Sequence, residues 1–200
     1  MSHSPRRAHS RAIRKEIVAL LAQLYLFPQT VRALTAALGA RFPGLEQDAA
    51  RDALMYLEKK GYIRLAQGQG GRTTARVTPK GIDLADGAIS DDAISPIRPG
   101  PAALALARQT RLLILAYCRR FPEAWNGDDE ILAETSPILA GAVSLDQVRY
   151  HLWYLAGKGC LEMKTRAHLR DVVVMARITA RGMDLLDGAT EDPGVGDAIP

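Results

Sequence analysis

One stretch of the chain occurs twice, and this duplication restricts the folds that are open to it. Residues 54–65 read LMYLEKKGYIRL and residues 152–163 read LWYLAGKGCLEM, so that five identical residues recur 98 positions later. A second shared segment reads VTPKGIDLADG at 77–87 and ITARGMDLLDG at 178–188. A self-similar unit of roughly ninety residues is too long for a solenoid repeat and has the size of a small domain. The sequence therefore predicts two compact units.

Both copies follow the same order of local patterns. A helical pattern ends in Lys-Gly, and glycine suits the left-handed conformation at which helices often end. A short strand with alternating apolar residues follows, then a glycine-rich or basic tip and a second strand. A threonine that can cap a last short helix closes each copy. The patterns predict an α+β fold, mostly helical, with one hairpin in each unit.

This order resembles the winged helix-turn-helix proteins, in which the third helix reads DNA and the hairpin is the wing. The residues Leu-x-x-Lys-Gly-x-(Ile/Leu), followed by Arg-(Val/Ile)-Thr-x-(Lys/Arg)-Gly, resemble bacterial regulators of the MarR, ArsR and PadR type. The second copy also resembles the small winged-helix proteins of Mu-like transposable phages. The resemblance covers most of residues 12–90 and 106–192 and implies two tandem winged helix-turn-helix domains.

The predicted organisation has five parts. A basic arm at 1–11 precedes a first domain at 12–94, a proline-rich linker at 95–105, a second domain at 106–192 and a tail at 193–200. The prolines of the linker make it stiff and unable to continue a helix. The tail is rich in Gly and Pro, and we expect it to be loose.

Positive charge is concentrated in the first half of the chain. The net charge is +4, and residues 1–98 hold 15 Lys and Arg against 9 Asp and Glu, whereas the remainder holds 11 against 13. A basic surplus favours a polyanionic partner. Within the arm, Arg6, Arg7 and Arg11 precede the first acidic residue, Glu16. Such an arm can lie along DNA phosphates or enter a minor groove, or it can be a solvated tail.

The two predicted reading helices differ in character. In the first, at 45–60, the apolar spacing leaves Gln47, Asp48, Arg51, Asp52 and Met55 facing outward. Gln47 and Arg51 suit base edges, but the carboxylates oppose a phosphate backbone, so we expect a weak reader. The second helix, capped by Ser144 at 145–158, presents Gln147, Arg149, Tyr150 and Trp153 partly or wholly outward. An aromatic pair beside an arginine suits a protein interface as well as DNA.

The wings supply the remaining candidate residues for DNA contact. The first tip is rich in glycine and is flanked by Arg72, and the second carries Lys164, Arg166, His168 and Arg170, the densest basic tip in the chain. The complete set predicted to contact DNA is Arg6, Arg7, Arg11, Gln47, Arg51, Arg72, Gln147, Arg149, Tyr150, Lys164, Arg166 and Arg170.

Several local expectations complete the prediction. We expect the first helix to begin near Ala12 and a second helix, capped by Thr30, to run from Val31 to Leu38 and stop at Gly39. Trp125-Asn126-Gly127 has the composition of a turn. Asp128 and Asp129 after it read as a solvated helix start that suits the helix dipole rather than as a catalytic pair. Cys118 and Cys160 lie in apolar patterns and read as core residues.

Nothing in the sequence indicates catalysis. The four histidines and two cysteines have no metal-ligand spacing, and no glycine-rich phosphate cradle lies between a strand and a helix. We therefore expect no enzyme activity, cofactor or metal. We find no signal-peptide pattern and no apolar run of membrane-spanning length, so we expect a cytoplasmic protein that does not contact membranes.

Three functions are compatible with these features. The first is a DNA-binding regulator of transcription or replication, of bacterial or phage origin, with double-stranded DNA as its partner. The second is an adaptor whose winged helices bind a protein partner or another copy of the chain, and the third is a scaffold or inhibitor that acts on a host protein. The arm and wings favour the first function, and the acidic residues of the reading helices favour the other two.

Overall fold

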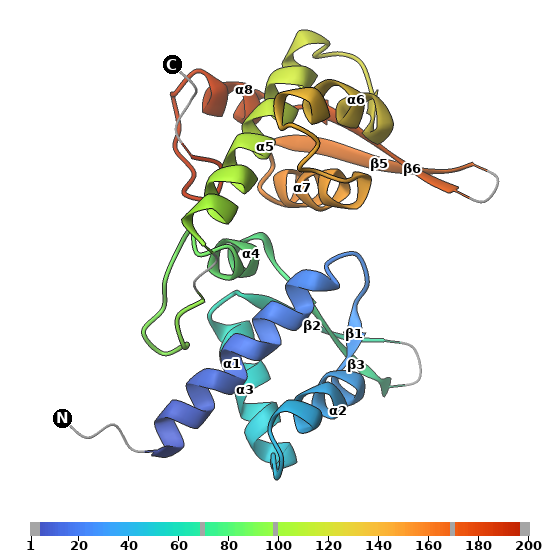
Figure 1. Cartoon of the computed structure of the whole chain (residues 1–200). Coiled ribbons are helices and arrows are strands. Elements are labelled where there is room, and N and C mark those ends of the chain that lie inside the picture. Colours follow the sequence, from blue (N-terminus) through green and yellow to red (C-terminus); the bar gives the residue numbers. More distant parts are fainter. Residues whose placement is uncertain (1–4, 69–70, 98–99, 169–170, 197–200) are drawn as a thin grey trace. The chain divides into compact units, whose positions relative to one another are not determined.

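A computed structural model describes residues 5–68, 71–97, 100–168 and 171–196. The chain divides into two compact units, residues 1–99 and residues 100–200 (Figure 1). Within each unit the elements follow the order helix, short strand, two helices, hairpin and short helix. This is the order of a winged helix, so the predicted fold, mostly helical α+β with two tandem winged-helix units, is confirmed.

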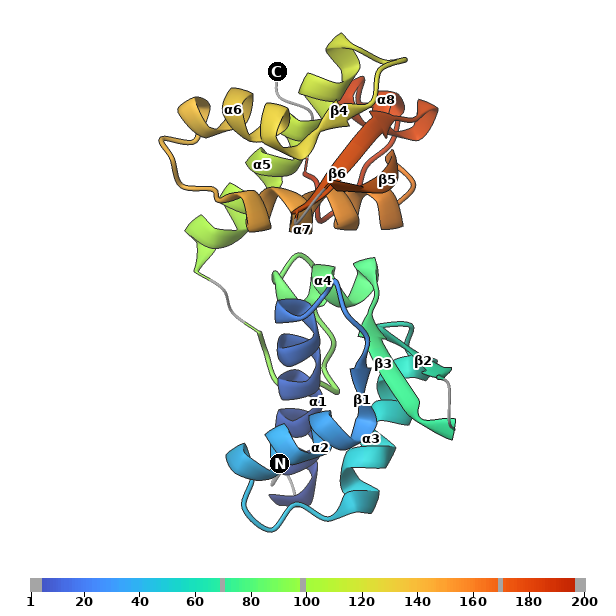
Figure 2. The same cartoon turned by 90° about the vertical axis from the view of Figure 1, so that its right-hand side faces the viewer.

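Within its described residues, the first unit contains four helices and three strands. They are α1 (Pro5–Gln23), β1 (Gln29–Thr30), α2 (Val31–Arg41), α3 (Gln47–Lys59), β2 (Ile63–Gln67), β3 (Thr73–Val77) and α4 (Pro79–Ala85). The strands form an antiparallel sheet in the order β1-β3-β2. Helix α1 packs against α2, α3, α4 and β3, as Figure 2 shows for the unit that holds the N-terminus. The core between them is formed by Ile13, Ile17, Leu21, Leu38, Leu54, Leu57, Ile63 and Ile82.

The second unit repeats this arrangement with a longer hairpin. Its elements are α5 (Pro101–Arg120), β4 (Asn126–Gly127), α6 (Asp128–Ile138), α7 (Leu145–Gly157), β5 (Leu161–His168), β6 (Asp171–Ile178) and α8 (Ala180–Leu186). The sheet order is β4-β6-β5. Figure 1 shows the β5–β6 hairpin extending away from the helices of its unit. The core contains Ile114, Leu115, Val148, Leu152, Leu155 and Ala176, together with Cys118 and Cys160, which are buried and free as expected.

The repeated Thr-x-x-Gly motif joins the hairpin to the last helix of each unit. The Thr78 hydroxyl accepts a hydrogen bond from the Gly81 N–H and donates to the Gly61 carbonyl. Thr179 makes the same two contacts with the equivalent glycines of the second unit. Glycine is required because a Cβ at position 81 would lie 2.1 Å from the Tyr62 carbonyl oxygen. The motif thus fixes the short helix against the start of the hairpin.

A short segment after the last helix, which we call the strap, covers one side of each unit. The straps are residues 88–95 and 189–196. Ile94 and Val195 occupy equivalent places in them and are almost completely buried. The first strap is held by Arg14 of α1. Its guanidinium stacks 3.7 Å from the centre of the Tyr56 ring and donates a hydrogen bond to the Ala93 carbonyl of the strap. Asp91 accepts hydrogen bonds from Lys60 and Tyr62.

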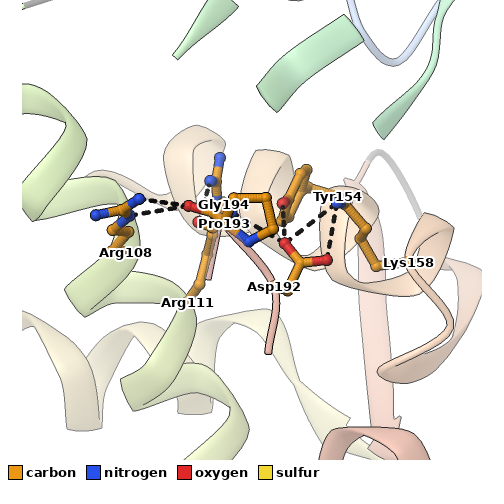
Figure 3. Close-up of polar contacts among 7 residues, drawn as sticks. All are labelled: Arg108, Arg111, Tyr154, Lys158, Asp192, Pro193 and Gly194. Carbon is orange, nitrogen blue, oxygen red and sulfur yellow. Dashed lines mark hydrogen bonds and ion pairs between the residues drawn. The ribbon is translucent and has the colours of Figure 1, made fainter. Parts of the chain in front are cut away.

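The second strap is held by matching residues. Arg111 stacks 3.8 Å from the centre of the Tyr154 ring and donates to the Gly194 carbonyl at 2.7 Å. Tyr154 and Lys158 both donate to the carboxylate of Asp192 (Figure 3). These contacts correct the expectation of a loose tail, because residues 193–196 belong to the folded unit and Val195 is fully buried. Residues 197–200 of the predicted tail lie outside the described part of the chain.

Helix boundaries differ from the prediction in three places. Helix α1 begins at Pro5 instead of near Ala12, because proline is well placed in a first helical turn and the Ala and Arg residues after it favour helix. Helix α2 continues through Gly39 to Arg41, which forms an ion pair with Glu16 of α1. Helix α5 begins at Pro101, within the predicted linker.

The two short strands were not predicted. Gln29–Thr30 pairs with β3, and Asn126–Gly127 pairs with β6, so the predicted turn at Asn126-Gly127 is wrong. The Asn126 side chain is buried and donates to the Ala176 carbonyl of β6. Thr30 nevertheless caps α2 as expected, since its hydroxyl accepts from the Ala33 N–H.

Candidate nucleic-acid interface

The hairpin of the second unit has an apolar inner face and a charged outer face. Side chains alternate along a strand, so residues at every second position share a face. Leu161, Val174, Ala176 and Ile178 face inward and are buried. On the other face the pairing places Glu162 opposite Arg177, Lys164 opposite Met175 and Arg166 opposite Val173. The predicted wing residues Lys164 and Arg166 therefore lie on one surface, which we call the outer wing face.

Trp125 contributes an aromatic ring to the outer wing face. It directly precedes β4, whose Asn126 pairs with Ala176 of β6. The Lys164 ammonium lies 3.9 Å from the centre of the Trp125 ring, and the Arg177 guanidinium lies 5.0 Å from it. Arg177 also donates two hydrogen bonds to Glu162. Two cations thus lie close to the ring, and one of them, Arg177, is paired with a carboxylate.

Lys164 and Arg166 carry the positive charge of this face. Both side chains are exposed, and within the described part of the chain neither forms an ion pair. By contrast, Trp125, Val173 and Met175 are half-buried. Two cations two residues apart on one strand can meet neighbouring phosphates, which position a nucleic acid without reading its sequence.

In the second reading helix, Arg149 is bound within the protein. Its Nε donates to Oδ2 of Asp128 at 2.5 Å, and the side chain is 23% exposed. Asp128 itself is 2% exposed, which corrects the expectation that it lies in a solvated helix start. An arginine that neutralises a buried carboxylate cannot turn to a base edge without leaving that charge unpaired. The ion pair instead joins the start of α6 to α7.

The other two candidates on α7 are also partly engaged. The Gln147 side chain is exposed, but its oxygen accepts a hydrogen bond from the Ser144 N–H while the Ser144 hydroxyl caps the helix. Tyr150 is half-buried and makes an edge contact with His151, with ring centres 5.2 Å apart. The predicted reading residues of the second unit are therefore built into its own structure to different degrees.

The residues of the first reading helix that were predicted to contact DNA face outward, as their spacing predicted, but acidic side chains lie beside them. Gln47 and Arg51 are exposed on one face of α3, beside the exposed carboxylates of Asp48 and Asp52. Arg72 is exposed immediately before β3. Arg76 is half-buried and donates to the Tyr25 carbonyl. The first unit thus exposes a mixed surface instead of a basic one.

The predicted basic arm is not a separate segment. Arg6, Arg7 and Arg11 lie in α1, although nothing is described of the side chains of Arg6 and Arg7. Arg11 is half-buried, and its carbonyl accepts a hydrogen bond from the Ser95 N–H of the first strap. Arg170 of the second wing lies outside the described residues.

Three further residues of the outer wing face, Trp125, Val173 and Met175, are not among those predicted from the sequence. The sequence predicts a turn at Trp125, and Val173 and Met175 lie in a run of apolar residues without an obvious outward side. The alternation of DVVVMARI contained the signal, because Val174, Ala176 and Ile178 form one set and the residues between them form the other.

The described residues contain no group of three or more His, Cys, Asp or Glu arranged to hold a metal ion. None of the helices described is both long enough and apolar enough to cross a lipid bilayer.

The chain was compared with family models, curated proteins and solved structures. No family model matches the chain, and no curated protein matches it. A chain from a structure described as the Nse1-Nse3-Nse4 complex is similar over 91% of this chain and 85% of that chain, with 13% sequence identity and a TM-score of 0.29. At this level of similarity, the assignment of the fold rests on the elements and sheet order of the two units themselves.

Proposed function

We propose that this chain binds double-stranded DNA through the outer wing face of its second unit. The observation that carries the proposal is the pair of exposed cations, Lys164 and Arg166, on one surface of a projecting hairpin. A hairpin of this kind can follow a groove while its cations contact the phosphates. Residues 99–200 hold 11 Lys and Arg against 13 Asp and Glu, so the proposal depends on the local charge of this face and not on the net charge of the chain.

The proposed binding is largely independent of DNA sequence. Recognition of a base requires a donor or acceptor that can reach its edge. Arg149 is paired with Asp128, and Gln147 takes part in the cap of α7. In the first unit, Asp48 and Asp52 flank the exposed Gln47 and Arg51. We therefore propose a protein that contacts the backbone, in place of the site-specific regulator that the motif resemblance implies.

A second candidate function is protein binding by the first unit. Met55 lies in the middle of the outer face of α3 and is 42% exposed, with Arg51, Asp52 and Glu58 around it. Met and Arg are both enriched at protein interfaces, and the rim of such interfaces is polar. This surface supports an adaptor role and does not require the wing of the second unit.

Binding of a mixed-sequence duplex, measured by fluorescence anisotropy at several salt concentrations, tests the DNA proposal. Each phosphate contact contributes about 0.9 to the slope of log affinity against log salt. The double variant Lys164→Gln/Arg166→Gln should therefore lower the slope by up to about two and weaken binding to unrelated sequences equally. The matched control is Arg119→Gln/Arg120→Gln, which removes the same charge from α5. Equal effects of the two double variants, or no binding of the wild-type protein at low salt, would contradict the proposal.

A further inference from the structure

The outer wing face differs between two units that otherwise share their fold. The pair formed by Ala66 and Thr74 in the first unit corresponds to Lys164 and Met175 in the second. Pro28, which precedes β1, takes the place that Trp125 holds before β4. The second unit therefore carries an aromatic ring, a thioether and a cation at positions where the first unit keeps the same fold without them.

These side chains suit a ligand that has both flat apolar groups and regularly spaced negative charges. Trp125, Val173 and Met175 form a half-buried apolar strip, and Lys164 and Arg166 border it. Single-stranded nucleic acid has this chemistry, because its unpaired bases stack on aromatic rings while its phosphates follow a cationic groove. An acidic peptide would satisfy the cations but would bring no regular series of flat groups to the indole.

The contact between Lys164 and Trp125 does not block a base. An exposed cation–π contact favours the bound arrangement by a factor of about two to five. A base that stacks on an aromatic ring contributes from about fivefold to more than a hundredfold. A base can therefore displace the ammonium from the ring, and the ammonium remains close enough to pair with the phosphate of that nucleotide.

We infer that Trp125 is a stacking platform for an unpaired base, and that the outer wing face binds single-stranded DNA or RNA with Lys164 and Arg166 on its phosphates. The inference rests on the proposed function, which supplies the phosphate contacts. It adds that the second unit prefers single-stranded to double-stranded nucleic acid. In a duplex the bases are stacked on one another and cannot reach the indole. Single strands therefore gain a contact that duplexes lack.

Tryptophan fluorescence provides a direct test, because the chain contains two tryptophans. In Trp153→Phe the only remaining reporter is Trp125, and in Trp125→Phe it is Trp153. A mixed-sequence single-stranded 20-mer should quench the first variant strongly and the second weakly, whereas the corresponding duplex should quench neither strongly. Equal quenching of the two variants by the single strand would overturn the inference.

Affinities of unlabelled variants complete the test. Trp125→Ala should weaken single-strand binding by at least about fivefold and change duplex binding by less than about twofold. Trp125→Leu, which keeps an apolar side chain against β6, should show the same selectivity if the alanine variant does not fold. If duplex binding depends on Lys164 and Arg166 but the substitution of Trp125 leaves single-strand binding unchanged, the stacking inference is refuted and the proposed function is not. Failure to bind either form would refute the proposed function as well.

Discussion

At the scale of single residues, chemically similar side chains have different roles because of what surrounds them. Arg149 and Lys164 were both predicted to contact DNA. In the folded chain, Lys164 is exposed over Trp125, whereas Arg149 neutralises a carboxylate that is almost completely buried. The sequence could not distinguish them, since Asp128 precedes Arg149 by 21 residues and meets it only when α6 packs on α7.

The ion pair between Asp128 and Arg149 should therefore contribute to stability. Arg149→Ala leaves Asp128 buried and unpaired, and we expect the free energy of unfolding to fall by roughly 3 kcal/mol. Asp128→Ala removes the buried charge itself, so that a further Arg149→Ala leaves no carboxylate unpaired. The double variant should therefore lose less free energy of unfolding than the two single variants lose together. Chemical denaturation of the four proteins measures this coupling. Additive losses would show that the two side chains do not interact.

His151 should make stability depend on pH. Burial, and secondarily the positive charge of Arg111, lower the pKa of His151 to about 3, and its Nδ1 accepts a hydrogen bond from Arg111. An unfolded histidine has a pKa of about 6.5, so between these two values the unfolded chain binds a proton that the folded chain does not. The free energy of unfolding should consequently fall as the pH decreases from about 6.5, by up to about 1.4 kcal/mol for each pH unit.

The control for this prediction is His151→Asn, whose amide oxygen can accept from Arg111 in place of Nδ1. Between about pH 6.5 and pH 4.5 this variant should have a flatter dependence of stability on pH than the wild-type protein. The carboxyl groups of Asp91 and Asp192 also make stability depend on pH, but at lower pH, because the pKa of each is below its ordinary value. Burial alone would raise the pKa of Asp192, but Lys158, the Gly194 N–H and Tyr154 lower it. Its contribution is thus lost only below about pH 4. Identical pH profiles of the two proteins above that range would contradict the role given to His151.

At the scale of elements, the sequence predicted what depends on periodicity and local caps. The inward faces of α3 and α7, the caps at Thr30 and Ser144, and both hairpins agree with the spacing of apolar and turn residues. The short strands β1 and β4 were missed because two residues carry no periodicity, and their pairing partners lie more than forty positions away. The outer wing face depends on β4, so its aromatic member could not be found without the structure.

Of the glycines in the first unit that the structure describes, Gly81 of the Thr-x-x-Gly motif should tolerate substitution least. Gly81→Ala would place a methyl group 2.1 Å from the Tyr62 carbonyl oxygen, and we expect a loss of more than about 3 kcal/mol, since backbone must move. Gly39 is the control, because it lies within α2 and a Cβ there meets no atom within 4 Å. Gly39→Ala should stabilise the first unit by about 0.5–1 kcal/mol. Urea denaturation compares the two variants, and equal losses would refute the steric explanation.

At the scale of the whole molecule, the duplication extends further than the sequence identity indicated. Arg14, Tyr56 and Ala93 in the first unit have the same mutual contacts as Arg111, Tyr154 and Gly194 in the second. The arginine and the strap carbonyl lie 79 positions apart in the first unit and 83 in the second, so no local pattern could reveal the contact. Each strap therefore joins the end of its own unit to that unit's first helix.

This arrangement predicts that each unit unfolds as a separate body whose stability depends on its own strap. A chain that ends after Gly188 loses the buried Val195 and the contacts of Asp192 and Gly194, while Arg111 remains buried without its carbonyl partner. We expect the loss to exceed about 3 kcal/mol, which lowers the melting temperature of a domain of this size by more than about 10 °C.

The comparison is with a chain that ends after Gly196 and so keeps the complete second strap. Differential scanning calorimetry of the two truncated chains should show one transition, from the first unit, at the same temperature in both. The transition of the second unit should move only in the shorter chain, because the first strap and its contacts with Arg14 are unchanged. A single transition that moves as a whole would mean that the two units unfold together, and an unchanged second transition would mean that the strap contacts do not stabilise the unit.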